Sequence, residues 1–148
     1  MSLYLDASAV MAVVAEEDAN ALVDPVIRNA GTSVLLSEFC LAECSAAVSK
    51  LAHMRIRTIG EADLLLDRLD RWAAALSNRT AIENSDVTQA TGLVRRHELK
   101  LRAPDAIHIA AAHRLGATLV TLDRGMARAA TALGLPCINP AETSALKD

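Results

Sequence analysis

The chain has 148 residues, 52% of them hydrophobic, and a formal net charge of −3 at pH 7. This length favours a single domain over residues 1–148, with a sizeable core. The apolar runs are too short to span a membrane, and the N-terminus lacks the pattern of a signal peptide. Three cysteines, an odd number, argue against a disulfide framework and fit a reducing cytoplasm. The small negative charge does not indicate nucleic-acid binding, so any such function needs a local basic patch.

Short apolar runs alternate with helical patterns along the chain. We expect strands at 3–6, 33–36, 81–83, 117–122 and 136–138. We expect helices at 9–16, 18–29, 38–53, 61–76, 86–98, 103–114 and 125–133, followed by a tail at 139–148 that could hold a helical turn. Ser8 and Ser37 are suitable N-caps for the first and third helices. This alternation indicates the α/β class: a three-layer α/β/α sandwich around a parallel sheet of four to five strands.

Four acidic residues lie at positions in the sequence that are not typical of solvent-exposed surface carboxylates. Asp6 and Asp123 each close an apolar run that we expect to be a strand. Glu43 interrupts the apolar face of a helix, and Asp105 lies in the first turn of another. If the two strands are parallel neighbours, Asp6 and Asp123 share the carboxyl edge of the sheet, where open α/β sheets place their sites. Four converging carboxylates would repel one another without a cation, and oxygen ligands without His or Cys suit Mg²⁺ or Mn²⁺.

Each acid also has a structural interpretation. Asp6, Asp105 and Asp123 could cap helices, where the N-terminal dipole favours a carboxylate by roughly 0.3–1 kcal/mol. Glu43 needs a partner, a cation or a cleft, because burying an unpartnered carboxylate is costly. The metal hypothesis depends on all four acids converging. Acids that each capped a separate helix would rarely all point to one edge of the sheet.

Some polar neighbours of these acids are weaker candidates. Ser8 and Thr121 could hydrogen-bond a carboxylate or a metal-bound water, or contribute only to capping and strand packing. His108 shares a helix face with Asp105 and could orient it or contact substrate. A packed histidine that is hydrogen-bonded to the backbone is the simpler interpretation of His108.

Basic residues precede the third acid in a cluster: Arg95, Arg96, Lys100 and Arg102. They could bind phosphate groups beside the acids, with Arg102 closest to them, or simply form a solvent-exposed face. Cys40 and Cys44 have no second Cys or His pair, and we interpret them as small core residues.

Four stretches of the chain resemble the acid-bearing motifs of PIN-domain ribonucleases, in the same order. They are LYLDASAV (3–10), SEFCLAEC (37–44), LRAPDAIHIA (101–110) and GATLVTLD (116–123). Their acids match Asp6, Glu43, Asp105 and Asp123, and the resemblance covers nearly the whole chain. The segment 55–91 carries no family motif, so it leaves the choice of substrate open.

Small single-domain PIN proteins of this length resemble VapC-type toxins of bacterial and archaeal toxin–antitoxin pairs. The resemblance implies a PIN-like fold, Mg²⁺- or Mn²⁺-dependent cleavage of RNA, a homodimer and inhibition by a cognate antitoxin. Asp6, Glu43 and Asp105 would hold one ion, and Asp123 would complete the cluster or help to hold a second. Lys100, Arg102, Ser8 and Thr121 are the candidates for substrate contact.

Two rival functions remain open at this stage. One is a non-catalytic PIN-like module that binds a partner, which the four intact acids argue against. The other is an acidic-pocket phosphotransfer enzyme or receiver. A haloacid-dehalogenase-like phosphatase would need a second Asp where this chain has Ser8, and a receiver would need paired acids after the first strand.

Overall fold

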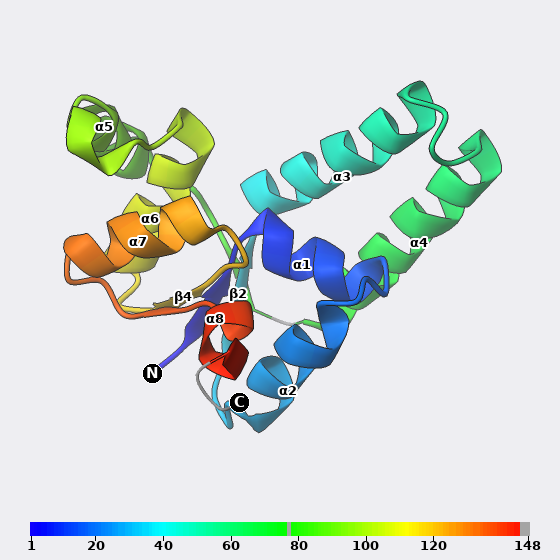
Figure 1. The fold of residues 1–148 in the computed structure, drawn as a ribbon, viewed down its shortest axis with the longest axis horizontal. Helices are drawn as coiled ribbons and strands as arrows, with labels where there is room; N and C mark the ends of the chain where they lie inside the picture. The colour runs from blue at the N-terminus through cyan, green and yellow to red at the C-terminus, as the bar shows by residue number, and fades with distance from the viewer. Residues whose placement is uncertain (77, 146–148) are drawn as a thin grey trace.

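A parallel sheet organises the part of the chain that the structure describes, residues 1–76 and 78–145 (Figure 1). In this computed structural model the strands lie in the order β3-β2-β1-β4-β5, and each neighbouring pair is parallel. Their bounds are β1 Leu3–Leu5, β2 Val34–Ser37, β3 Arg79–Thr80, β4 Thr118–Val120 and β5 Cys137–Ile138. From β1, the chain first adds β2 and β3 on one side of the sheet and then β4 and β5 on the other. The carboxyl ends of β1 and β4 therefore flank the crevice where open sheets bind ligands.

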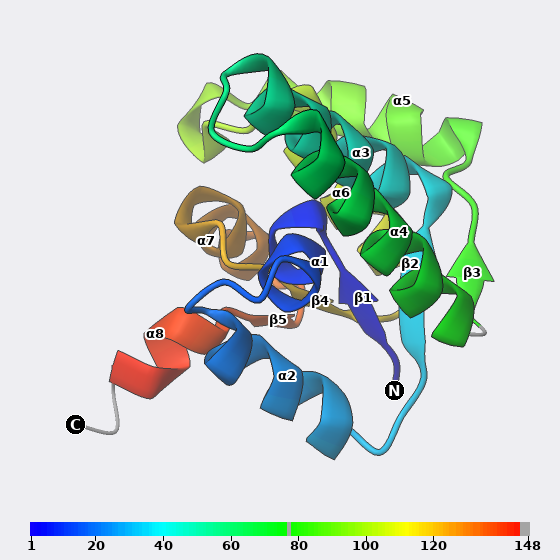
Figure 2. The same cartoon turned by 90° about the vertical axis from the view of Figure 1, so that its right-hand side faces the viewer.

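Helices cover both faces of this sheet, as Figure 2 shows from a second direction. One core packs against α1 (Ala7–Val14), α2 (Asn20–Asn29), α3 (Glu38–His53) and α4 (Ile59–Ala75). The other packs against α5 (Asn84–Val94), α6 (Ala103–Arg114) and α7 (Arg124–Ala132). A 3₁₀ turn, η1 (His97–Leu99), follows α5, and α8 (Pro140–Ala145) contacts α2. The predicted α/β/α sandwich with a parallel sheet is confirmed.

The central strands contribute side chains to both cores. Leu3 and Leu5 of β1 enter the core beneath α1–α4, whereas Tyr4 enters the core beneath α5–α7. Burying each leucine stabilises the fold by roughly 2 kcal/mol. Because both faces are covered, the strand sequence is a continuous apolar run rather than an alternating one. No described helix combines the length and the apolar character that crossing a membrane would need.

Some local predictions are wrong. The third strand is Arg79–Thr80 rather than 81–83, because backbone pairing with the end of β2, not apolar side chains, defines this edge. Asp6 rather than Ser8 caps α1: its carboxylate accepts a 3.0 Å hydrogen bond from the backbone N–H of Ala9. The segment 86–98 divides into α5 and η1. The helical turn that the tail could hold is present as α8, and residues 146–148 lie outside the described residues.

Candidate active site at the carboxyl edge of the sheet

Asp6 and Asp123 lie at the carboxyl ends of neighbouring parallel strands, as predicted. Asp6 follows β1 directly, and Asp123 is the N-cap of α7, where it accepts a 2.8 Å hydrogen bond from the backbone N–H of Met126. Thr121 connects the two acids. Its hydroxyl donates to Asp6 Oδ2 at 2.6 Å and accepts a 3.0 Å hydrogen bond from the N–H of Asp123.

Asp6 is the most deeply buried of the four acids, with 2% of its surface exposed. Its carboxylate accepts hydrogen bonds from the hydroxyls of Ser8 (2.7 Å) and Thr121 and from the N–H of Ala9. Burial raises the pKa of Asp6 above its ordinary value of 3.8, and these hydrogen bonds only oppose the shift. Within the described residues no basic side chain forms an ion pair with Asp6. The edge therefore holds a buried acid whose charge neutral donors stabilise only in part.

Asp105 and Asp123 share one cation, Arg102. Asp105 lies in the first turn of α6, and its Oδ2 accepts from the backbone N–H of Arg102 at 3.3 Å and from its Nε at 3.2 Å. Nη2 of Arg102 lies 3.8 Å from Asp123 Oδ2. The Arg102 side chain is 77% exposed, so these ion pairs contribute only about 0–1 kcal/mol each. A positive group thus already stands between two of the predicted ligands.

Glu43 has a different partner, His108. Its side chain, on the second turn of α3, is 27% exposed and contacts Nε2 of His108, which is 1% exposed. Nδ1 of His108 lies 2.8 Å from the Tyr4 hydroxyl. Both ring nitrogens therefore bind side chains, so the interpretation of His108 as a histidine bonded to the backbone is wrong. The partners are 104 and 65 residues away in sequence, and no local pattern could have indicated them.

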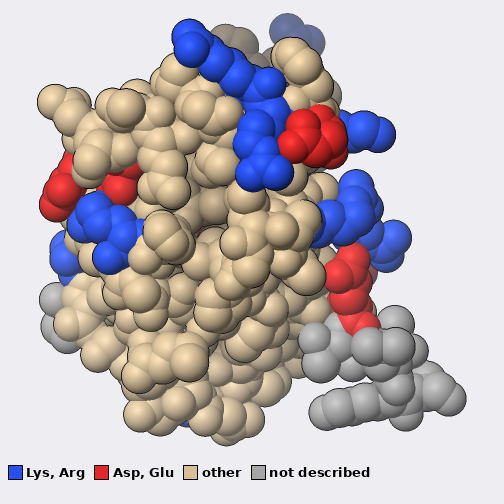
Figure 3. Space-filling view, turned by 90° about the vertical axis from the view of Figure 1, so that its left-hand side faces the viewer, with Lys and Arg blue, Asp and Glu red and all other residues tan. Residues whose placement is uncertain are grey.

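The basic residues near this edge do not act as one group. Lys100 ends η1 with φ +52° and lines a groove of about 410 Å³ together with Arg128 and Gly125 of α7. Arg96 instead pairs with Glu98 at 2.9 Å. Lys and Arg side chains gather at the upper right of the face shown in Figure 3, with acidic side chains among them. Positive side chains thus gather on this face although the chain carries a small net negative charge.

The oxygen-only donor set fits a hard divalent cation in its chemistry. Yet within residues 1–76 and 78–145, no three His, Cys, Asp or Glu side chains form a group that could hold a metal ion. Two of the acids are in contact with other side chains instead, Glu43 with His108 and Asp105 with Arg102. Asp6 and Asp123 are joined through Thr121, whereas no hydrogen bond described here joins Glu43 to the other acids.

The fold and this edge define an α/β protein with acidic residues at the switch point of an open parallel sheet. Sequence comparison identifies the family: the PIN domain matches residues 3–132. The chain belongs to the PIN domain family. No curated protein matches it.

Solved structures of low sequence identity share the fold. FitAcB from Neisseria gonorrhoeae is 18% identical with a TM-score of 0.70, covering 94% of this chain and 98% of that one. VapBC2 from Rickettsia felis, bound to a DNA fragment from their promoter, is 17% identical with a TM-score of 0.69, covering 93% and 98%. The sarcin–ricin loop cleaving toxin VapC20 from Mycobacterium tuberculosis is 15% identical with a TM-score of 0.68, covering 93% and 97%.

Proposed function

We propose that this protein is a metal-dependent endoribonuclease and the toxin of a toxin–antitoxin pair. The observation that carries the proposal is the buried carboxylate of Asp6, which forms no ion pair within the described residues, at the switch point of a PIN-family sheet, with Asp123 beside it. Membership of the PIN family and the fold shared with the toxin VapC20 and with FitAcB support it.

In this proposal Asp6, Glu43 and Asp105 hold one Mg²⁺ or Mn²⁺, directly or through water, and Asp123 completes the cluster or helps to hold a second ion. A bound ion of this kind lowers the pKa of a water ligand and stabilises charge on the attacked phosphate. Thr121 donates to Asp6 and so directs the carboxylate that anchors the site. Arg102 would leave its contacts with the acids when the ion binds.

The substrate would approach over the basic side of the edge. Lys100 and Arg102 are the proposed phosphate contacts, and the groove between Lys100 and Arg128 offers room beside them. Ser8 and Thr121 act through Asp6 in this account, because both hydroxyls donate to its carboxylate. The binding of RNA would therefore weaken with added salt.

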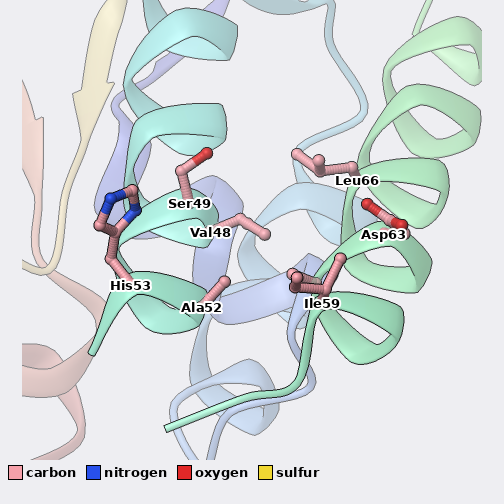
Figure 4. Close-up of a pocket in the computed structure, with 8 residues that line it drawn as sticks. Val48, Ser49, Ala52, His53, Ile59, Asp63 and Leu66 are labelled. Carbon is pink, nitrogen blue, oxygen red and sulfur yellow. The ribbon is translucent and has the colours of Figure 1, made fainter. Parts of the chain in front are cut away.

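A protein partner is supported by the apolar surface of the α3–α4 hairpin. Ile59 is 75% exposed and Leu64 69% exposed. Across a groove of about 450 Å³, Val48 of α3 faces Ile59 and Leu66 of α4 (Figure 4). The fold is shared with VapBC2 and with the toxin VapC20, and we propose that a cognate antitoxin covers the acidic edge here and silences cleavage. A homodimer is proposed on the same family grounds.

The test is RNA cleavage by purified protein with Mg²⁺ or Mn²⁺, repeated with excess EDTA. We expect cleavage that stops with the chelator and that Asp105→Asn abolishes. Equal cleavage in EDTA by the parent and by this variant would contradict the proposal. Metal binding without cleavage would favour the non-catalytic PIN-like module.

Light scattering at micromolar concentration tests the proposed homodimer, and a monomer would refute it.

A further inference from the structure

We propose that Tyr4 and His108 form a positioning pair that orients the carboxylate of Glu43 at the acidic edge. The three residues come from β1, α6 and α3, so the pair connects both layers of helices through the sheet. Nε2 of His108 contacts Glu43 Oε1, and Nδ1 lies 2.8 Å from the Tyr4 hydroxyl. This inference rests on the proposed function, because it assigns a role toward one of the proposed ligands.

The imidazole of His108 is held in place from several sides. Tyr4 is fully buried and His108 is 1% exposed. The His108 ring centroid lies 5.6 Å from that of Tyr4 and 5.2 Å from that of Phe39. The Tyr4 hydroxyl is also 3.3 Å from Oγ of Ser37, the N-cap of α3, on which Glu43 stands. A side chain so enclosed can direct a flexible glutamate, because its own rotamer is already restricted.

The hydrogen bonds also determine which ring nitrogen must carry a proton. An ionised carboxylate only accepts, so the contact with Glu43 requires a hydrogen on Nε2 of His108. The single hydrogen of the Tyr4 hydroxyl can go to Oγ of Ser37 or to Nδ1 of His108, and the contact with His108 is the shorter, 2.8 Å against 3.3 Å. Donation to Nδ1 leaves the hydrogen of a neutral imidazole on Nε2. Tyr4 therefore selects the tautomer that serves Glu43, as second-layer partners do for metal-ligating groups.

The geometry differs from that of a purely structural buried histidine. A purely structural histidine needs hydrogen-bond partners only inside the core, and Tyr4 is such a partner for Nδ1. The other nitrogen of His108 instead faces Glu43, whose side chain is 27% exposed. The buried pair thus positions the side chain of a partly exposed residue of the proposed site.

The first readout needs no metal: nitrogen-resolved NMR of the histidine side chains in the metal-free protein. We expect the His108 hydrogen on Nε2 in the parent, and a mixture of tautomers in Tyr4→Phe, which loses only the hydroxyl. A hydrogen on Nδ1 alone in the parent would overturn the inference, whether or not the protein proves to be a nuclease.

The second readout is the dissociation constant for Mn²⁺, measured with kcat and KM for RNA. We expect His108→Leu to weaken Mn²⁺ binding by about 10- to 100-fold and to lower kcat without raising KM. His108→Gln, which keeps an amide donor near the place of Nε2, should restore part of the loss. Ile109→Val, a buried change on the same helix, is the matched control and should bind Mn²⁺ as the parent does. Parental Mn²⁺ affinity in His108→Leu would overturn the inference, whereas a parent that neither binds Mn²⁺ nor cuts RNA would refute the proposed function.

Discussion

Asp6 and Asp86 are both buried carboxylates, with 2% and 1% exposure, but their surroundings differ in charge. Arg114 donates to both oxygens of Asp86, from Nε at 2.8 Å and Nη2 at 2.9 Å, and the N–H of Glu83 adds a third hydrogen bond. Asp6 receives hydrogen bonds only from hydroxyls and one amide in the described residues. The hydrogen bonds from Arg114 lower the pKa of Asp86, whereas burial raises the pKa of Asp6.

The presence or absence of a positively charged partner distinguishes a structural acid from a candidate metal ligand better than the exposed fraction does. Asp86 and Arg114 join α5 to α6, and Arg114 also donates to the carbonyl of Ala81 at 2.9 Å. Every charge in that cluster has its counter-ion in the fold. At the acidic edge the exposed Arg102 is shared by two acids, and Asp6 forms no ion pair in the described residues. A divalent ion would supply the charge that is missing there.

The largest expected effect is on cleavage. Asp6→Asn should lower kcat by about 1,000-fold or more, because a catalytic ion is worth several kcal/mol of transition-state stabilisation. Asp63→Asn removes the same charge from the exposed face of α4 and is the matched control. RNA cleavage is measured for both with Mn²⁺. If the two variants cut at the same rate, the acidic edge is not the site of catalysis.

The next effect is on stability. Asp86→Asn should lower the free energy of unfolding by about 3 kcal/mol, because it leaves Arg114 without its buried partner. Asp67→Asn, which breaks an exposed pair with Arg71, should change it by less than about 0.5 kcal/mol. Urea unfolding at pH 7 gives both values. Equal small losses would show that the Asp86 pair is no stronger than a surface one.

The two buried acids should also respond oppositely to pH. The pKa of Asp86 is lowered in the fold, so its stabilisation is present above 3.8 and is lost as pH falls through its folded pKa. The pKa of Asp6 is raised, so its destabilisation is absent below 3.8 and grows as pH rises toward its folded pKa. The loss caused by Asp86→Asn should therefore shrink in acid. A loss that is independent of pH would contradict this assignment.

A smaller effect concerns the binding of RNA. Replacing Lys100 and Arg102 with Ala should weaken RNA binding by about tenfold and reduce the slope of affinity against salt by about one to two charges. The double change Arg55→Ala and Arg57→Ala, on exposed residues between α3 and α4, is the control of equal charge. Binding is measured at several salt concentrations. An unchanged slope in the first pair would show that this face is only solvated.

The central strands could be predicted because they carry short but uninterrupted apolar runs, whereas the edge strand β3 could not. β3 is two residues long, Arg79 and Thr80, and its signal is backbone pairing with β2 rather than side-chain pattern. The placement of Asp6 and Asp123 followed from strand ends, which sequence does reveal. The partners of these acids did not follow from sequence, because they are supplied by distant elements. His108 meets Tyr4 and Glu43 only after β1, α3 and α6 have packed together.

The most direct test of the missing counter-ion is urea unfolding of the parent and Asp6→Asn at pH 7, each with EDTA and with Mn²⁺. Without metal, we expect the variant to be as stable as the parent or more stable, because the change removes an uncompensated buried charge. Mn²⁺ at a hundred times its dissociation constant should stabilise the parent by about 2.7 kcal/mol, and Asp6→Asn should lose most of that gain. A parent that Mn²⁺ does not stabilise, together with a variant that is equally destabilised in both conditions, would contradict the account and leave Asp6 with no role beyond capping α1.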